Sequence, residues 1–388
     1  MRDLGSLPTG DLRSDLRIMA RHVMAGANRR EDQIDMRIRE TFTHAVSALA
    51  IGALVAFTWP ADADAEDKRV RWNMGSAFGS KLTQLGTLGV SLSEKVERST
   101  GGNIRLKFFE PGALVPPLEM FDAISAGSLD AAWSTPGYWV GKDETFAMFS
   151  AVPFGPRAGE YLGWMYYGGG KELMDELYAE FNIKSITCGV IAPEASGWFR
   201  KEINSVEDMK GLKMRFFGLG AKVMEKMGVS TQLLAGGDIF PALERGSIDA
   251  TEFSMPAIDL NLGFYQVAKH YYFPGWHQQA TLFELMMNKD KYDALSETQK
   301  AQLEMACGDN VREGLAEGEA IQGAALAELQ SKGVTIHRWP PEVLDTLNNA
   351  WTEVANELAA ENPNFKKVWE SYSAFREQYK IWDELGYL

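Results

Sequence analysis

The chain has 388 residues, 45% of them hydrophobic and 24% charged, which is enough for two folded lobes rather than one core. A formal net charge of −14 disfavours binding to nucleic acid or anionic membranes, so any anionic ligand must be held by a local positive group. Cys188 and Cys307 are too few for a disulfide framework or a multi-cysteine metal site, and we expect both to be buried free thiols.

The N-terminal segment resembles an export signal. Residues 45–59 form an apolar run that is too short to span a bilayer, with Arg37 and Arg39 before it and the small-residue motif Ala63-Asp64-Ala65 after it. This order is typical of a cleaved secretory signal peptide. An uncleaved membrane anchor is the alternative.

The expected boundaries of the signal are residues 36–65. Residues 1–35 are polar and charged, unlike a signal n-region, and indicate a mis-called start. The mature chain then begins near Glu66. Because no later segment approaches membrane length, we expect a periplasmic protein whose mature part does not insert into the membrane.

The first part of the mature chain alternates between strands and helices. Strand patterns at 70–78 and 103–109 flank a helical pattern at 82–100, and a helix at 120–128 precedes a short strand at 129–133. Such alternation predicts an α/β fold with a parallel or mixed sheet.

An internal echo suggests that this unit occurs twice. Residues 120–134 resemble residues 239–254, with Gly127 matching Gly246 and Asp130 matching Asp249. Two distant copies of a helix, a glycine and a short strand indicate two similarly built lobes, with a ligand crevice at the carboxyl ends of their strands. Chance similarity of a common helix-to-strand junction is the alternative.

The second half contains one buried-looking strand with a single cation and then long helices. Arg215 lies in the apolar strand predicted at 212–217, just before a glycine-rich turn and a helix at 221–228. After Met286 the chain reads as long amphipathic helices that connect and cover the lobes.

Catalytic motifs are missing from the sequence. It contains no HExxH, GxSxG or Walker loop, and the mature chain has only three histidines. The run Gly168-Gly169-Gly170 fits a tight turn better than a phosphate loop. His277 beside Trp276 is more typical of a packed cleft residue than of a base. We therefore expect a protein that is not an enzyme.

A binding site is easier to assemble. The planar guanidinium of Arg215 fits a carboxylate, and the following helix N-terminus adds backbone donors. A surface ion pair is the alternative role for this arginine. Glu252 and Glu194, if both face the crevice, would form an oxygen site for Na⁺ or Ca²⁺, although each alone is commonly a solvated charge. Tyr138, Trp139 and the aromatic segment 271–279 could supply apolar walls.

Three segments together resemble a known family. FFEPGALVPPLEMFDAISAGSLDAAWSTPGYWVGKDETFAMFSAVPF, GWFRKEINSVEDMKGLKMRFFGLGAKVMEKMGV and LAGGDIFPALERGSIDATEF are similar to the substrate-binding subunit of TRAP (tripartite ATP-independent periplasmic) transporters, closest to its α-keto-acid and calcium-lactate-binding branch. The resemblance runs from about Arg71 to beyond Trp382. It implies a two-lobed periplasmic-binding-protein-like α/β fold with mixed sheets flanked by helices and a long connecting helix.

The resemblance also implies residue roles. Arg215 falls on the carboxylate-binding arginine, and a bridging Ca²⁺ or Na⁺ would be held by Glu194, Glu252, the Phe253 carbonyl and Gln278. The substrate pocket would comprise Arg215, Tyr138, Trp139, Glu194, Phe253, Trp276 and Gln278. The chain departs from the keto-acid receptors by carrying a carboxylate at Glu194 and an amide at Gln278, so the charge is swapped and the choice between Na⁺ and Ca²⁺ stays open.

Together these features predict the organisation and the function of the protein. Lobe I would comprise residues 66–192 and about 279–320, and lobe II residues 193–278 and about 321–388 with the C-terminal helices. The expected function is a receptor that binds a small 2-oxo or 2-hydroxy monocarboxylate and delivers it to TRAP membrane subunits. Alternatives are a periplasmic metal-dependent enzyme at Glu194 and Glu252, or a receptor of an ATP-driven importer. A swapped C-terminal helix is not expected, and the oligomeric state stays open.

Overall fold

The computed structural model describes residues 67–191 and 193–387. The expected late start and signal peptide lie outside these residues. Within the described part of the chain, no helix combines the length and the apolar character needed to cross a membrane.

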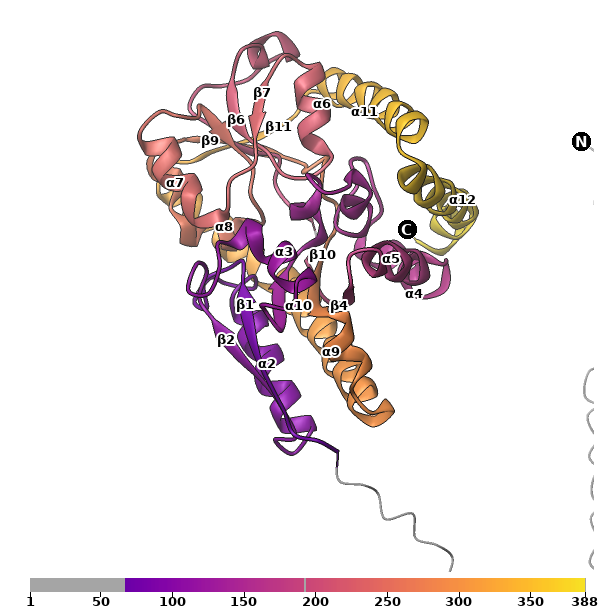
Figure 1. The fold of residues 1–388 in the computed structure, drawn as a ribbon. Coiled ribbons are helices and arrows are strands. Elements are labelled where there is room, and N and C mark those ends of the chain that lie inside the picture. Colours follow the sequence, from indigo (N-terminus) through magenta and orange to yellow (C-terminus); the bar gives the residue numbers. More distant parts are fainter. Residues whose placement is uncertain (1–66, 192, 388) are drawn as a thin grey trace, which may run out of the picture. The chain divides into compact units, whose positions relative to one another are not determined.

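The first sheet has five strands and mixed pairing (Figure 1). Two of its inner strands, residues 131–134 and 281–288, are buried along their whole length, as expected for strands covered by helices on both faces. Strands β2, β1 and β3 run parallel, and β10 pairs antiparallel with both β3 and β4. In order across the sheet, the strands are β2 (Ile104–Phe109), β1 (Val70–Ser76), β3 (Ala131–Ser134), β10 (Thr281–Asn288) and β4 (Ile183–Ile191).

The second sheet has six short strands and is also mixed. Strand β6 pairs parallel with β7 and β8, while β5 runs antiparallel to β8 and β9. In order, the strands are β11 (Thr335–Arg338), β9 (His270–Phe273), β5 (Gly197–Phe199), β8 (Ala250–Thr251), β6 (Lys213–Arg215) and β7 (Ser230–Gln232). Two mixed sheets flanked by helices confirm the predicted two-lobed α/β class.

The sequence echo is a structural repeat. In the first sheet, helix α3 (Met120–Ser125) leads through Gly127 into β3, and in the second, α7 (Gly236–Glu244) leads through Gly246 towards β8. Both glycines have φ of 74°, a left-handed value that favours glycine. Asp130 Oδ2 accepts a hydrogen bond from a backbone N–H of β1 at 2.8 Å, and Asp249 Oδ2 accepts one from β6 at 3.0 Å. In each copy, the aspartate at the start of the short strand therefore accepts a hydrogen bond from the parallel neighbouring strand.

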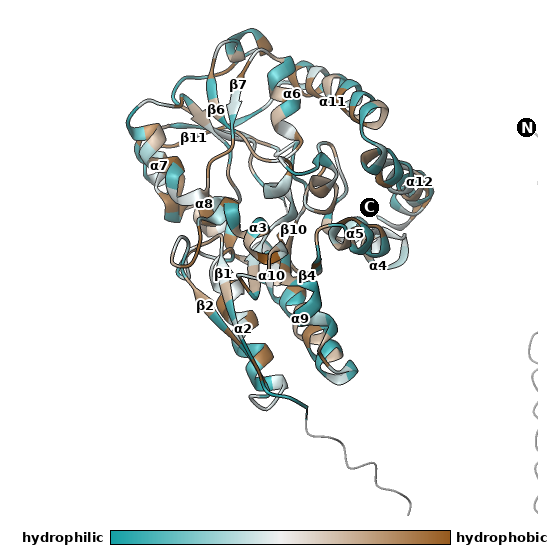
Figure 2. Cartoon of the chain, viewed as in Figure 1, coloured by the Kyte–Doolittle hydropathy of each residue, from teal (hydrophilic) through white to brown (hydrophobic). Residues whose placement is uncertain are grey.

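Helices cover both sheets, and their hydrophobic and polar residues mix along each helix (Figure 2). The long helix α10 (Glu297–Ser331) begins at a capping box of Ser296 and Gln299 and packs against β4, α2 and α8. Helix α11 packs on α6, and α12 returns to α4 and α5, where Arg376 Nε lies 2.9 Å from Glu160 Oε1. The remaining bounds are α2 (Thr87–Ser99), α4 (Ala158–Tyr167), α5 (Gly170–Ala179), α6 (Gly220–Lys226), α8 (Pro256–Leu262), α9 (Lys289–Asp293), α11 (Pro341–Glu361) and α12 (Pro363–Gly386).

The chain passes between the sheets at three places. It leaves the first sheet after β4, returns to it between β9 and β10, and leaves again along α10 towards β11. Every strand of the first sheet lies within the residue ranges predicted for lobe I, and every strand of the second within those predicted for lobe II. The exact lobe boundaries stay a prediction.

The two cysteines correct one expectation. Cys188 on β4 and Cys307 on α10 are joined as a disulfide, with their Cα atoms 4.1 Å apart, and both are fully buried. The prediction of free thiols was wrong, although the burial was right. The cysteines are 119 residues apart in sequence, and only the packing of α10 against β4 brings them together.

Candidate functional site

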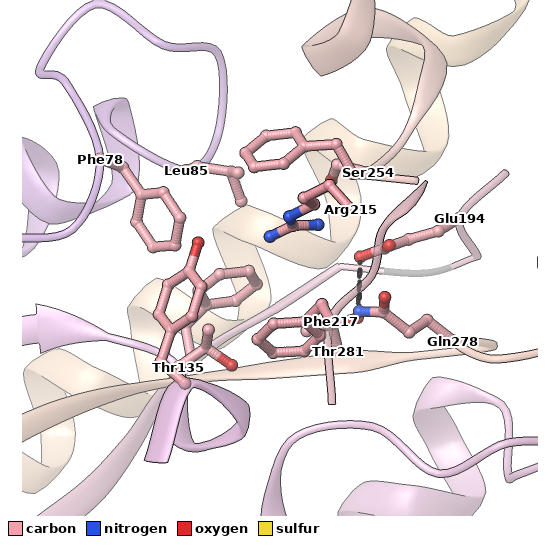
Figure 3. Close-up of a pocket in the computed structure, with 12 residues that line it drawn as sticks. Phe78, Leu85, Thr135, Glu194, Arg215, Phe217, Ser254, Gln278 and Thr281 are labelled. Atoms are coloured by element: carbon pink, nitrogen blue, oxygen red, sulfur yellow. Dashed lines mark hydrogen bonds between the residues drawn. The ribbon is translucent and has the colours of Figure 1, made fainter. Parts of the chain in front are cut away.

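A small cavity lies where the strands of both sheets end, as expected for α/β folds (Figure 3). Its volume is about 20 Å³. The lining combines aromatic rings with a few polar groups. The lining residues are Phe78, Leu85, Thr135, Tyr138, Glu194, Arg215, Phe217, Phe253, Ser254, Gln278, Thr281 and Phe283.

Arg215, the last residue of β6, is only 1% exposed. Its Nη1 donates to the Glu252 carbonyl at 3.0 Å and to Glu252 Oε1 at 2.6 Å, and its Nε donates to the Leu234 carbonyl at 3.2 Å. The rings of Phe217 and Phe253 lie 5.9 and 5.3 Å from its Cζ. A ligand carboxylate that used both terminal nitrogens of Arg215 would therefore share Nη1 with Glu252.

Glu252 follows β8 and is 0% exposed. Burial alone opposes its ionisation, but the Arg215 guanidinium and then His277 outweigh burial and lower the pKa of Glu252 below its usual value. Its Oε1 is held by Arg215, whereas its Oε2 has no hydrogen-bond partner among the described residues. Glu252 thus offers one ionised, unpaired oxygen next to the cavity.

Glu194 lies in the crossing from β4 to β5 and faces Gln278 in the crossing from β9 to β10 (Figure 3). The Glu194 N–H donates to the Gln278 carbonyl at 3.1 Å, and the Gly275 N–H donates to the Glu194 carbonyl at 3.0 Å. A Cβ at Gly275 would lie 2.3 Å from that carbonyl oxygen, so only glycine allows this approach. The β4–β5 and β9–β10 connections are therefore hydrogen-bonded to each other at the site.

Only one of the two carboxyl oxygens of Glu194 has hydrogen-bond partners among the described residues. Its Oε1 accepts hydrogen bonds from Thr281 Oγ1 at 2.8 Å and from Gln278 Nε2 at 3.2 Å. Burial, followed by the charge of Glu252, raises the pKa of Glu194 well above its usual value. A cation beside Glu194 would favour the ionised carboxylate and so counteract the rise in its pKa.

His277, which the sequence indicates as a packed cleft residue, lies at the site. It is 1% exposed, and neither of its ring nitrogens has a hydrogen-bond partner among the described residues. Its Nε2 lies 3.5 Å from Glu252 Oε2. Donor atoms of Glu194, Glu252 and His277 all lie within 4.8 Å of one another, a spacing that suits ligands of one metal ion. Only its place beside Gln278 could have hinted at this role.

Unpaired polar atoms are concentrated at this site. Buried polar groups in folded proteins nearly always have a partner, so a cluster without partners indicates a binding site for an ion or a polar ligand. Within residues 67–191 and 193–387, the buried atoms around the cavity without a partner are Glu194 Oε2, Glu252 Oε2, Gln278 Oε1, Ser254 Oγ, and Nδ1 and Nε2 of His277. These are hard oxygen donors with one imidazole, which suits a Na⁺ or Ca²⁺ site.

The aromatic walls differ in part from expectation. Tyr138 and the Phe253 ring line the cavity, but Trp139 and Trp276 are not among its lining residues. Trp139 instead donates its Nε1–H to the buried Glu284 on β10 at 2.7 Å, and Trp276 stacks on Phe154 with ring centroids 5.7 Å apart. Both tryptophans support the segments that carry lining residues.

The structure thus brings Arg215, Tyr138, Glu194, Phe253 and Gln278 to one cavity. Glu252 is hydrogen-bonded to Arg215 but is not itself a lining residue. The backbone carbonyl of Phe253, which we expect to be a cation ligand, accepts no hydrogen bond from the described residues. The sequence did not single out Phe78, Phe217, Ser254 or Thr281 as lining residues, although Phe217 lies in the strand predicted at 212–217 and Ser254 ends the second copy of the internal repeat.

Comparisons with known proteins identify the family. The profile of the bacterial extracellular solute-binding proteins, family 7, matches residues 74–362. A monocarboxylate 2-oxoacid-binding periplasmic protein from Nostoc sp. is 33% identical over 356 residues, which are 91% of this chain and 97% of that protein.

Solved structures agree with this assignment. A TRAP transporter solute-binding protein from Bordetella bronchiseptica, with copurified calcium and picolinate, is 34% identical with a TM-score of 0.80 over 82% of this chain and 95% of that one. Another from Pseudoalteromonas atlantica, with sodium and pyruvate, is 33% identical with a TM-score of 0.78 over 81% and 96%. These relatives are receptors of transporters rather than enzymes, which confirms the predicted class. The chain therefore belongs to the bacterial extracellular solute-binding proteins of family 7, the solute receptors of TRAP transporters.

Proposed function

We propose that this receptor binds a small 2-oxo or 2-hydroxy monocarboxylate together with Ca²⁺ or Na⁺ and delivers it from the periplasm to the membrane subunits of a TRAP transporter. The observation that carries the proposal is the cluster of buried, unpaired oxygen atoms beside the Arg215 guanidinium. The ligands of the Bordetella and Pseudoalteromonas proteins, a small carboxylate with calcium or sodium, support the same combination here.

The charges around the cavity support a cation. Glu194, Glu252 and Asp259 are all buried, and Arg215 is the only buried arginine of the described chain. Asp259 accepts hydrogen bonds from Trp198, Tyr271 and Ser254, yet burial raises its pKa to about 7. A ligand carboxylate adds one more negative charge. Because an unpaired buried charge costs several kcal/mol, a cation beside Glu194 and Glu252 stabilises the loaded site.

The cavity supports a short ligand. It is narrow, with a volume of about 20 Å³, and it is lined by Phe78, Tyr138 and Phe283, so it favours a small acid with a short alkyl group over a bulky ligand. Arg215 Nη2 and the cation would hold the carboxylate and the 2-oxo or 2-hydroxy oxygen, while the alkyl end would lie against Phe78. Two adjacent oxygens on the ligand are what allow it to bridge an arginine and an ion.

Calorimetry with pyruvate and lactate tests this function. The mature protein is titrated with each acid in Ca²⁺, in Na⁺, and after exhaustive chelation in sodium-free buffer. We expect pyruvate or lactate to bind in the presence of one or both ions. Without them, the affinity should be at least about tenfold lower, which is a loss of about 1.4 kcal/mol in binding free energy.

The variant Glu252→Gln should weaken cation-dependent binding, with Glu342→Gln on the exposed start of α11 as the matched control. Failure to bind any small 2-oxo or 2-hydroxy acid in the presence of both ions would contradict the proposed ligand class. Binding that is unchanged after chelation in sodium-free buffer would contradict the cation.

A further inference from the structure

We propose that His277 is a ligand of the cation in this site, so that the site also takes Mn²⁺ or Co²⁺ through an imidazole nitrogen. This inference rests on the cation site of the proposed function and adds a donor to it. The observation behind it is that His277 is buried, close to two carboxylates and without a partner at either ring nitrogen.

The unpaired state of His277 is unusual. A neutral imidazole has one N–H and one lone pair, and buried groups of this kind are nearly always hydrogen-bonded. Its Nε2 lies 3.5 Å from Glu252 Oε2, beyond the ordinary length of a hydrogen bond, and has no hydrogen-bond partner among the described residues. An unpaired ring nitrogen beside unpaired carboxylate oxygens is the arrangement that a metal ion completes.

The distances fit two ligands on one ion. Ligand atoms that lie about 2.1–2.4 Å from an ion and subtend about 90–110° at it are about 3.0–3.9 Å apart. The separation of 3.5 Å between His277 Nε2 and Glu252 Oε2 falls in this range, and Glu194 contributes an atom within 4.8 Å of both. The three residues come from the crossing after β4, the end of β8 and the crossing before β10, so the ion would join three separate segments.

The ring of His277 is held in place by its neighbours. It packs edge-on against Phe216 and Trp276, with ring centroids 5.0 and 5.5 Å away. A Cβ at Gly220 would lie 2.5 Å from the Phe216 ring and 3.0 Å from His277 Cβ, so a glycine is required where α6 passes the ring. An imidazole fixed in this way does not have to be ordered when a metal ion binds, which favours binding.

The added nitrogen changes which ions the site prefers. Carboxylate, carbonyl and amide oxygens suit Ca²⁺ and Na⁺, whereas imidazole favours first-row transition metals. A set of two carboxylates, one amide oxygen and one imidazole is therefore a mixed site. It should retain Ca²⁺ through Glu194, Glu252 and Gln278 and gain affinity for Mn²⁺ and Co²⁺ through His277.

Pulsed EPR on the wild-type protein provides the direct test. The mature protein is loaded with Mn²⁺, and echo modulation from a coordinated ¹⁴N is measured, then repeated after labelling histidine with ¹⁵N. We expect nitrogen modulation that changes with the label. This measurement needs no variant, so it stays decisive even if substitution of His277 disturbs folding.

Calorimetry with the metals alone gives the second test. His277→Gln should lower Mn²⁺ and Co²⁺ affinity by roughly tenfold or more and Ca²⁺ affinity by much less, because only the nitrogen donor is lost. His337→Gln, the same substitution on β11 outside the site, is the matched control. Thermal melting of both variants checks that they are folded.

The outcomes separate this inference from the proposed function. Bound Mn²⁺ without nitrogen modulation, or equal losses for Mn²⁺ and Ca²⁺ in His277→Gln, would show that His277 only positions Glu252 and would overturn the inference. Calcium-dependent pyruvate binding would then still support the proposed function. If neither Ca²⁺ nor Mn²⁺ binds, the inference fails, and if Na⁺ also leaves pyruvate binding unchanged, the cation in the proposed function fails as well.

Discussion

Replacing Arg215 tests the site most severely, because this residue neutralises Glu252 and lines the ligand cavity. In Arg215→Ala, the fully buried Glu252 carboxylate loses its only cationic hydrogen-bond donor among the described residues. Breaking such a buried pair costs about 3–5 kcal/mol of folding stability. Domains of this kind unfold at about 5–15 kcal/mol, so the variant should stay folded but clearly weakened.

The loss in ligand affinity should be of similar size. Removing one partner of a buried charge pair in a complex costs about 2–5 kcal/mol. That corresponds to a pyruvate affinity about 30-fold lower or worse. Arg215→Lys should retain much of the stability, since its charge stays beside Glu252. The Arg215→Lys variant should still bind pyruvate weakly. A single ammonium cannot make the hydrogen bonds of Nε and Nη1 and contact the ligand at the same time.

Two measurements separate the two effects. Urea unfolding followed by circular dichroism gives stability, and calorimetry with pyruvate at saturating Ca²⁺ gives affinity. Arg312→Ala is the control, since this arginine on α10 is 70% exposed and pairs only within its helix. Native-like pyruvate affinity in folded Arg215→Ala would refute the assignment of Arg215 as the carboxylate-binding residue.

Three further predictions concern other parts of the molecule. Phe78→Ala should improve binding of longer 2-oxo acids relative to pyruvate in calorimetry, because Phe78 lines both the cavity and a neighbouring groove; an unchanged chain-length preference would contradict this. Glu284→Ala should lower the urea-unfolding free energy by about 3 kcal/mol or more, since three buried donors lose their acceptor; a loss below 1 kcal/mol would argue against it. Thiol titration in denaturant should find no free thiol before reduction and two after it, and reactive Cys188 or Cys307 before reduction would disprove the disulfide.

Local patterns predicted much of the architecture. The echo around Gly127 and Gly246 correctly indicated two similar units, because a left-handed glycine and an aspartate are needed at the same points of both. The strand expected at 212–217 is shorter, Lys213–Arg215, since the two phenylalanines after Arg215 leave the sheet edge to pack around the site. Helix α12 was not predicted as a separate element.

The site was predicted less completely, for physical reasons. Arg215, Glu194 and Gln278 were named with the help of the family resemblance and do line the cavity. The ion pair that ties Arg215 to Glu252 depends on how β6 and β8 pair. The aromatic segment around His277 indicates burial, but the sequence does not show whether the ring nitrogens of His277 have hydrogen-bond partners. Contacts between distant segments decide both features, and a single sequence carries no direct sign of them.

The disulfide encloses most of the second sheet within a covalent ring. The chain between Cys188 and Cys307 contains β5, β6, β7, β8 and β9, that is, every strand of that sheet except β11. A protease that cuts once inside this ring leaves two pieces that remain a single molecule until the disulfide is reduced. In a compartment where disulfides persist, a nicked receptor would therefore keep both halves of its binding site at the same place.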